Sequence, residues 1–204
     1  MRNFEIKNEN GRSMIEMLGV LAIIGVLSVG GIAGYSKAMM KYRINKTIEQ
    51  ITLIAGNVRT FFAPQRNYEG LTNAVIKKAK LVPDEMWNGG EIKNVWGGTI
   101  FLVQADKSLT NDHKAFSLQM EPYPVIPMEA CIELTSQDWS SAGVTSIGIG
   151  YTEYQGWLKT PVSLDKAIEV CSTAYEKNDG EVYYYLNFDE DVNSDWYKNE
   201  AWKN

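Results

Sequence analysis

The chain has 204 residues, of which 45% are hydrophobic and 22% charged, and its formal net charge at pH 7 is -5. These values exclude a collagen, a globally disordered chain and a polytopic membrane protein, and they fit one domain with or without an appendage. Because an acidic chain is poorly suited to neutralise a phosphate backbone, we expect no specific nucleic-acid partner.

One stretch near the N-terminus, from Met17 to Ser36, runs for twenty residues without a charge. As a helix it would rise about 30 Å, the thickness of the hydrocarbon core of a bilayer. A secretory signal peptide has a shorter apolar core and a small-residue cleavage site, whereas Lys37, Lys41 and Arg43 follow here. Hydropathy alone therefore indicates an uncleaved N-terminal anchor, with a buried core helix as the less favoured alternative.

Two features distinguish this segment from a plain anchor. Glu16 stands at its start, and a carboxylate at membrane depth is a functional candidate because it needs a partner. The segment also contains five glycines, which permit close helix contacts but weaken an isolated helix: Gly19, Gly25, Gly30, Gly31 and Gly34. We expect it to pack against copies of itself and to bend or melt around Gly30–Gly34.

The residues from Gly11 to Glu16, GRSMIE, precede the apolar run directly. They resemble the processing motif of type IV prepilins, in which a short polar leader ends in Gly and the fifth mature residue is Glu. The resemblance implies a leader over residues 1–11, cleavage after Gly11 by the prepilin peptidase, and methylation of Arg12 as the first mature residue. Arg12 stands where the family usually has an apolar residue, and the leader contains Glu5 and Glu9.

The same resemblance implies an α+β fold of the type IV pilin kind, with a long N-terminal helix on an antiparallel β-sheet. Residues 12–36 would form the transmembrane and polymerisation helix, residues 37–63 its amphipathic continuation, and residues 64–204 the globular head. In the filament, Glu16 would pair with the α-amino group of a neighbouring subunit, which cleavage creates at the same depth.

Periodicity in the next segment agrees with a continuing helix. Apolar residues recur at steps of three and four, as on one face of a helix packed against a sheet: Ile44, Ile48, Ile51, Ala55, Val58 and Phe62. Pro64 ends the pattern. A short helix is expected over Leu71–Lys80. The following Gly-rich stretch, flanked by Trp87 and Trp96, is interpreted as a loop held by aromatic anchors, with a subunit contact as the alternative.

The remaining elements are expected in alternating order. Thr99–Ala105 and Ala115–Glu121 have the pattern of a hairpin, and Val144–Tyr151 that of a weak strand or turn. Helices are predicted over Met128–Trp139 and Ser163–Tyr175, the second with Ser163 as its N-cap and with Leu164, Ala167, Ile168 and Cys171 on one face. Val182–Phe188 follows the Asp179-Gly180 turn and is the strongest predicted strand.

The chain contains two cysteines, Cys131 and Cys171. In an oxidising compartment they would form a disulfide that closes a loop of about 40 residues, worth roughly 4 kcal/mol by chain entropy. In type IV pilins a C-terminal disulfide outlines a surface loop, the D-region. A D-region of about residues 131–171 resembles that of a type IVb major pilin. Two buried thiols are the alternative.

No catalytic set is visible in the sequence, and we expect neither enzymatic activity nor a cofactor or metal site. His113 is the only histidine, so no Ser-His-Asp set or zinc cluster can be assembled, and no phosphate-binding loop motif is present. The acidic cluster Asp189-Glu190-Asp191 with Asp195 could bind calcium, but it lacks the EF-hand spacing and is better interpreted as a solvated surface.

The resemblance therefore predicts a structural subunit of a type IVb-like pilus, made in the inner membrane of a Gram-negative bacterium and then carried in the extracellular fimbrium. Its partners would be copies of itself, the prepilin peptidase, the pilus assembly machinery and the surface of a host cell or a neighbouring bacterium. The pilus would support adhesion, aggregation or conjugation. A type II secretion pseudopilin or minor pilin is the alternative, and an anchored binding module that never polymerises is a third.

Overall fold

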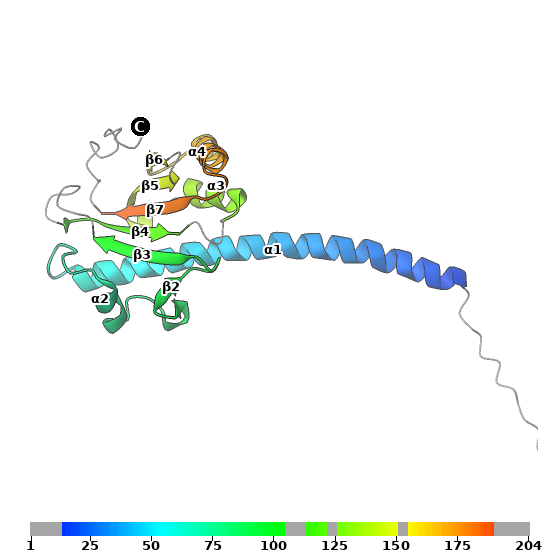
Figure 1. Cartoon of the computed structure of the whole chain (residues 1–204), viewed down its shortest axis with the longest axis horizontal. Helices are drawn as coiled ribbons and strands as arrows, with labels where there is room; N and C mark the ends of the chain where they lie inside the picture. The colour runs from blue at the N-terminus through cyan, green and yellow to red at the C-terminus, as the bar shows by residue number, and fades with distance from the viewer. Residues whose placement is uncertain (1–13, 105–112, 122–125, 151–154, 190–204) are drawn as a thin grey trace, which may run out of the picture. The chain divides into compact units, whose positions relative to one another are not determined.

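The computed structural model describes residues 14–104, 113–121, 126–150 and 155–189. The chain divides into two compact units, Met1–Lys41 and Tyr42–Asn204, and helix α1 (Met14–Phe62) contributes to both. The second unit contains the other helices and all strands of the described chain (Figure 1).

In the first unit, α1 is exposed along its whole apolar run. The side chains of Met14, Leu21 and Val26 are 82%, 60% and 75% exposed. The helix is continuous through Gly30–Gly34, so the melting expected there does not occur in this structure. This surface is long and apolar enough to cross a membrane.

In the second unit, α1 buries a stripe close to the predicted one. Ile44, Ile51, Ala55, Val58 and Phe62 are buried, as expected, whereas Ile48 is only half-buried. The stripe is wider than the apolar pattern indicated, since it also includes Thr47, Gln50 and Ile54. The helix ends at Phe62, two residues before the predicted stop at Pro64.

The head contains a seven-stranded antiparallel sheet with the strand order β1-β2-β3-β4-β7-β5-β6. Its strands are β1 (Trp87–Asn88), β2 (Glu91–Lys93), β3 (Thr99–Gln104), β4 (Phe116–Met120), β5 (Val144–Gly150), β6 (Gln155–Lys159) and β7 (Tyr183–Phe188). The predicted hairpin is confirmed, because β3 pairs with β4 from Ile100↔Met120 to Gln104↔Phe116. The strongest predicted strand, β7, lies between β4 and β5.

The Gly-rich stretch is a hairpin rather than the expected loop. β1 and β2 pair through Trp87↔Ile92 and Asn88↔Glu91. Gly89 and Gly90 join them with φ angles of 60° and 93°, the left-handed conformations that a tight two-residue hairpin turn requires. Such short strands do not provide enough residues for alternation to be recognised.

The predicted aromatic anchors are present in this part of the head. The indole N–H of Trp96 donates to the hydroxyl of Thr47 on α1 at 2.9 Å, and the Arg43 guanidinium lies 5.5 Å from its ring centroid. Trp87 is half-buried, with the Lys77 ammonium 5.5 Å from its ring centroid. Lys77 belongs to the short helix α2 (Asn73–Lys78), which lies inside the range predicted for it.

Two helices, α3 (Met128–Ser136) and α4 (Leu164–Lys177), complete the head together with two short 3-10 turns, η1 (Asp84–Met86) and η3 (Ser140–Ala142). Ser163 is the N-cap of α4 as predicted, accepting from the Lys166 N–H at 3.4 Å. Of the four residues predicted to share one face of α4, Ala167 and Cys171 are buried, whereas Leu164 and Ile168 are 57% and 43% exposed. The residues that the helix buries are the smaller Ala167, Val170, Cys171 and Ala174.

Candidate functional site

The residues predicted for processing and assembly lie at the start of the chain. Gly11 and Arg12 fall outside the described residues. Glu16 lies in the first turn of α1, where a carboxylate is favoured by the helix dipole, and its neighbours Ile15 and Met17 are 79% and 46% exposed. A carboxylate thus stands at the beginning of an apolar helical surface.

The glycines of this helix leave its surface open. A Cβ atom added at Gly19, Gly25, Gly30 or Gly34 would meet nothing within 4 Å in this single chain. Small residues on an apolar helix allow a second helix to approach closely. The surface is therefore suited to contact with another apolar helix or with lipid.

The cysteine pair lies between the two C-terminal helices. Cys131 of α3 and Cys171 of α4 form a disulfide with an S–S distance of 2.08 Å, so the predicted bridge is confirmed. Both residues are buried, at 1% and 0% exposure. The Thr135 hydroxyl lies 3.7 Å from the Cys171 Sγ and 3.2 Å from the Tyr184 hydroxyl. The bridge is therefore part of the core of the head and not a surface staple.

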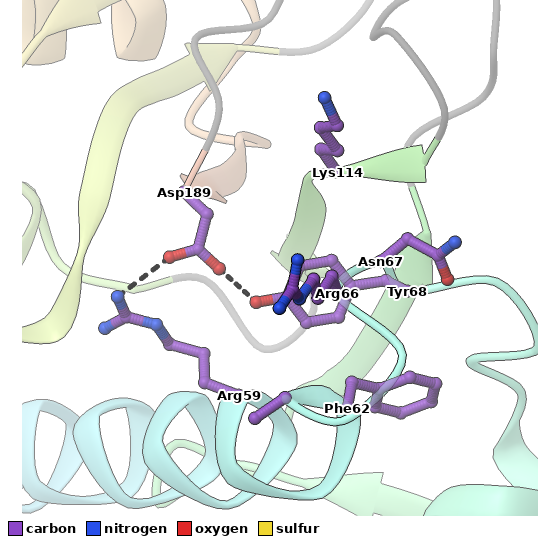
Figure 2. A pocket seen from close by; sticks show the side chains of 8 residues that line it. Arg59, Phe62, Arg66, Asn67, Tyr68, Lys114 and Asp189 are labelled. Carbon is purple, nitrogen blue, oxygen red and sulfur yellow. Dashed lines mark hydrogen bonds and ion pairs between the residues drawn. The ribbon is translucent and has the colours of Figure 1, made fainter.

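An open pocket of about 590 Å³ lies where α1 ends (Figure 2). We call it the basic pocket, and its lining consists of Arg59, Phe62, Ala63, Arg66, Asn67, Tyr68, Lys114 and Asp189. Three of these side chains are basic and one is acidic. No sequence pattern indicated this site, because its residues come from three separate parts of the chain.

Asp189 is the centre of the polar contacts in the basic pocket. Its Oδ1 lies 2.9 Å from the Arg59 Nη2, and its Oδ2 accepts from the Tyr68 hydroxyl. Burial raises the pKa of Tyr68, and the hydrogen bond to the Asp189 carboxylate raises it further. The Arg59 Nη1 also donates to the Ala142 carbonyl at 3.2 Å. The network therefore ties the end of β7 to α1.

Asp189 is the one residue of the predicted acidic cluster that the structure describes. Glu190, Asp191 and Asp195 lie outside the described residues. Asp189 is engaged by Arg59 and Tyr68. Within the described ranges, no group of three or more His, Cys, Asp or Glu side chains could hold a metal ion.

An aromatic series leads from the basic pocket into the sheet. The ring centroids of Phe62 and Tyr68 are 5.7 Å apart, those of Tyr68 and Phe116 4.7 Å, and those of Phe116 and Phe188 4.5 Å. Phe116 and Phe188 lie opposite each other on β4 and β7. The pocket thus adjoins the buried aromatic core of the head.

A long N-terminal helix, an antiparallel sheet and a C-terminal region closed by the Cys131–Cys171 bridge define the type IV pilin fold. A family model described as "PilS N terminal" matches residues 41–183, more than half of the chain. The chain belongs to this pilin family, so the resemblance stated from the processing motif is confirmed at the level of the family. Members of the family are structural subunits.

The chain also matches a solved structure described as "Crystal structure of type IV b pilin from Salmonella typhi". The two sequences are 15% identical, the match covers 72% of this chain and 99% of that chain, and the TM-score is 0.49. No curated protein matches the chain significantly.

Proposed function

We propose that the chain is made as a prepilin, cleaved after Gly11 and polymerised into a type IVb-like pilus. The observation that carries this proposal is the exposed apolar helix that begins at Met14, with Glu16 in its first turn, on a chain of the pilin family. An apolar surface of this length is unfavourable in water. It would lie in the inner membrane before assembly and in the filament core afterwards.

Cleavage after Gly11 removes the polar leader and leaves the apolar helix in the product. The new α-amino group on Arg12 then stands four residues before Glu16. Methylation of that amine keeps it a cation. The prepilin peptidase and the pilus assembly machinery are the partners that this route requires, and a Gram-negative envelope is the setting.

The mature N-terminus tests the processing step. Mass spectrometry of the chain from its native membrane should find residues 12–204 with one added methyl group. A Gly11→Leu variant should keep the leader. An intact N-terminus in the native chain would refute the cleavage and would favour an anchored module that never polymerises.

Glu16 is assigned to assembly, because a carboxylate in an apolar environment is stable only with a partner. The partner we propose is the N-terminal amine of a neighbouring subunit, which would fix the axial register between the two. Glu16→Ala and Glu16→Gln should therefore leave the chain in the membrane but abolish filaments.

Electron microscopy and membrane fractionation measure these two outcomes. Ser28→Ala is the matched control, because the Ser28 hydroxyl donates to the Ile24 carbonyl of its own helix at 2.7 Å. Normal filaments from the Glu16 variants would contradict the assignment. Long filaments composed of this chain would support a major pilin, and short or rare ones a pseudopilin or minor pilin.

The head would form the outer surface of the pilus. The segment closed by the Cys131–Cys171 bridge places two helices, α3 and α4, next to the sheet, and both present exposed charged side chains. We propose that this D-region contacts host cells or neighbouring bacteria in adhesion, aggregation or conjugation. Substitutions confined to exposed positions of α4 should alter those phenotypes without altering filament number.

A further inference from the structure

We infer that the basic pocket binds the carboxylate of an acidic sugar, held by Arg66 and Lys114. This inference goes beyond the proposed role in filament assembly and does not depend on it. The pocket lies entirely within the second unit of the chain, at the end of α1 and beside the first residues of β4.

The charges in the pocket favour an anion. Arg59 is engaged by Asp189, whose second oxygen accepts from the Tyr68 hydroxyl, so these two charges offset each other. Arg66 and Lys114 are exposed, and within the described residues neither forms an ion pair. Among the described residues, the pocket therefore contains two cations that are not paired with a carboxylate, in a chain whose net charge is -5.

A backbone contact joins the two segments that carry these cations. The Tyr68 N–H donates to the His113 carbonyl at 2.8 Å, which joins the turn after α1 to the residue before Lys114. Arg66 has a φ of 60° within that turn. Only five non-glycine residues of the described chain have a positive φ, and three of them line or adjoin this pocket: Arg66, His113 and Asp189.

This concentration of left-handed residues supports a functional origin. Aspartate and histidine adopt such angles several times more often than other residues, but arginine does so rarely. Sparsely populated backbone conformations cluster at ligand sites, where the surrounding structure holds them. A glycine at position 66 would adopt this turn without strain, yet the chain has arginine there.

The apolar lining favours a ligand larger than a bare ion. Phe62, Ala63 and Tyr68 line the pocket together with the cations; Phe62 and Tyr68 are 4% and 8% exposed, so only a small part of each ring is accessible. A volume of about 590 Å³ falls within the range of small-molecule sites, roughly 300–1,000 Å³. A guanidinium group can bind a carboxylate through two parallel hydrogen bonds, while the accessible apolar atoms of the lining can contact the apolar face of a sugar.

The test is calorimetric titration of the unassembled full-length chain in an uncharged detergent without a sugar headgroup. D-glucuronate should bind with a millimolar dissociation constant, whereas D-glucose and acetate should bind at least tenfold more weakly. Arg66→Gln/Lys114→Gln should weaken glucuronate binding at least tenfold. The control Lys78→Gln/Lys177→Gln removes two exposed cations outside the pocket and should leave it unchanged.

Arg66→Gly separates ligand binding from folding. Because glycine tolerates a φ of 60°, this variant should retain the melting temperature of the native chain and still lose glucuronate binding. A glycan that ends in glucuronate should bind as the free sugar does, with the same dependence on Arg66 and Lys114; weaker binding of the glycan would restrict the site to the free acid.

Four results would overturn the proposal. Equal binding of glucose would exclude recognition of the charge, and equal binding of acetate would exclude recognition of the ring. Undiminished binding by the Arg66/Lys114 double variant would place the site elsewhere. Absent glucuronate binding, together with altered self-association of that variant, would make the pocket a contact between heads. Since the titration uses unassembled chain, a failure of filament formation would not affect it.

Discussion

At the scale of single residues, Gly143 illustrates how closely α1 and the sheet fit together. Its φ is 77°, and a Cβ atom added there would lie 2.6 Å from the Nη1 of Arg59. That guanidinium is held by Asp189 and by the Ala142 carbonyl, so it cannot move aside freely. Gly143→Ala should therefore reduce the free energy of unfolding by about 2–3 kcal/mol, measured by urea denaturation.

Gly70 provides the matched control for this prediction. Its φ is 85°, but an added Cβ atom would meet nothing within 4 Å, so Gly70→Ala should lose only the backbone component, about 1 kcal/mol. Adding Arg59→Ala to Gly143→Ala should recover the steric part, so that the two losses are not additive. If Gly143→Ala and Gly70→Ala reduced the free energy of unfolding equally, the contact with Arg59 would not contribute to the loss at position 143.

At the scale of elements, the α3–α4 pair depends on the Cys131–Cys171 bridge. The bridge closes a loop with a sequence separation of 40, and the chain-entropy model gives about 4 kcal/mol for such a loop. Cys131→Ala/Cys171→Ala should therefore reduce the free energy of unfolding by about that amount, with an added loss from removed core contacts. Chemical denaturation with circular dichroism measures the change.

The burial of the Cys131–Cys171 bridge leads to a second prediction, on its accessibility to reductants. The two cysteines are 1% and 0% exposed, so a reductant should act on the native head only through unfolding. Alkylation after mild reduction should label neither cysteine in native protein and both in urea. Rapid labelling of the native chain would contradict the buried position.

The elements also show where periodicity is a sufficient signal. The stripe of α1 was predicted because its apolar residues recur at the helical period. The β3–β4 hairpin and β7 were predicted from strand-forming residues next to turn or polar segments. Periodicity predicted the helix α4 but did not indicate which of its residues are buried, because small residues such as Ala167 and Ala174 are buried while the larger Leu164 and Ile168 are exposed. β1 and β2 were missed because they have only two and three residues, and β6 was missed because Gln155–Lys159 shows no alternation of apolar and polar residues.

For the molecule as a whole, three tyrosines should make the head less stable at alkaline pH. Burial is the first cause that raises the pKa of Tyr68, Tyr175 and Tyr184 above the ordinary value of 10.0. In the folded head these hydroxyls stay protonated at a pH where the unfolded chain loses their protons. The stabilisation is complete below pH 10 and is lost as pH rises above it.

Each tyrosine should lower the free energy of unfolding by up to about 1.4 kcal/mol per pH unit above that point. Urea denaturation at several pH values between neutrality and strong alkali measures the slope. Tyr184→Phe should reduce the slope by about one third, since it removes one of the three groups. A slope that is unchanged in this variant would contradict the role given to Tyr184.

Sequence signals alone were sufficient to predict the pilin class of this protein and its long apolar helix. An uncharged run of twenty residues after Gly11 and Glu16 predicted the helix and the pilin family, because both signals are local and follow chain order. The two cysteines left a choice between a bridge and free thiols that only the juxtaposition of α3 and α4 decided.

Only the tertiary structure revealed the basic pocket. Arg59, Arg66, Lys114 and Asp189 belong to a helix, a turn and the ends of two strands, and no spacing in the sequence links them. They meet because β4 and β7 are neighbours in the sheet and because the Tyr68 N–H binds the His113 carbonyl. The period of apolar residues in the sequence indicates which side chains face the core. Which charged side chains lie near one another on the surface depends instead on which strands pair in the sheet.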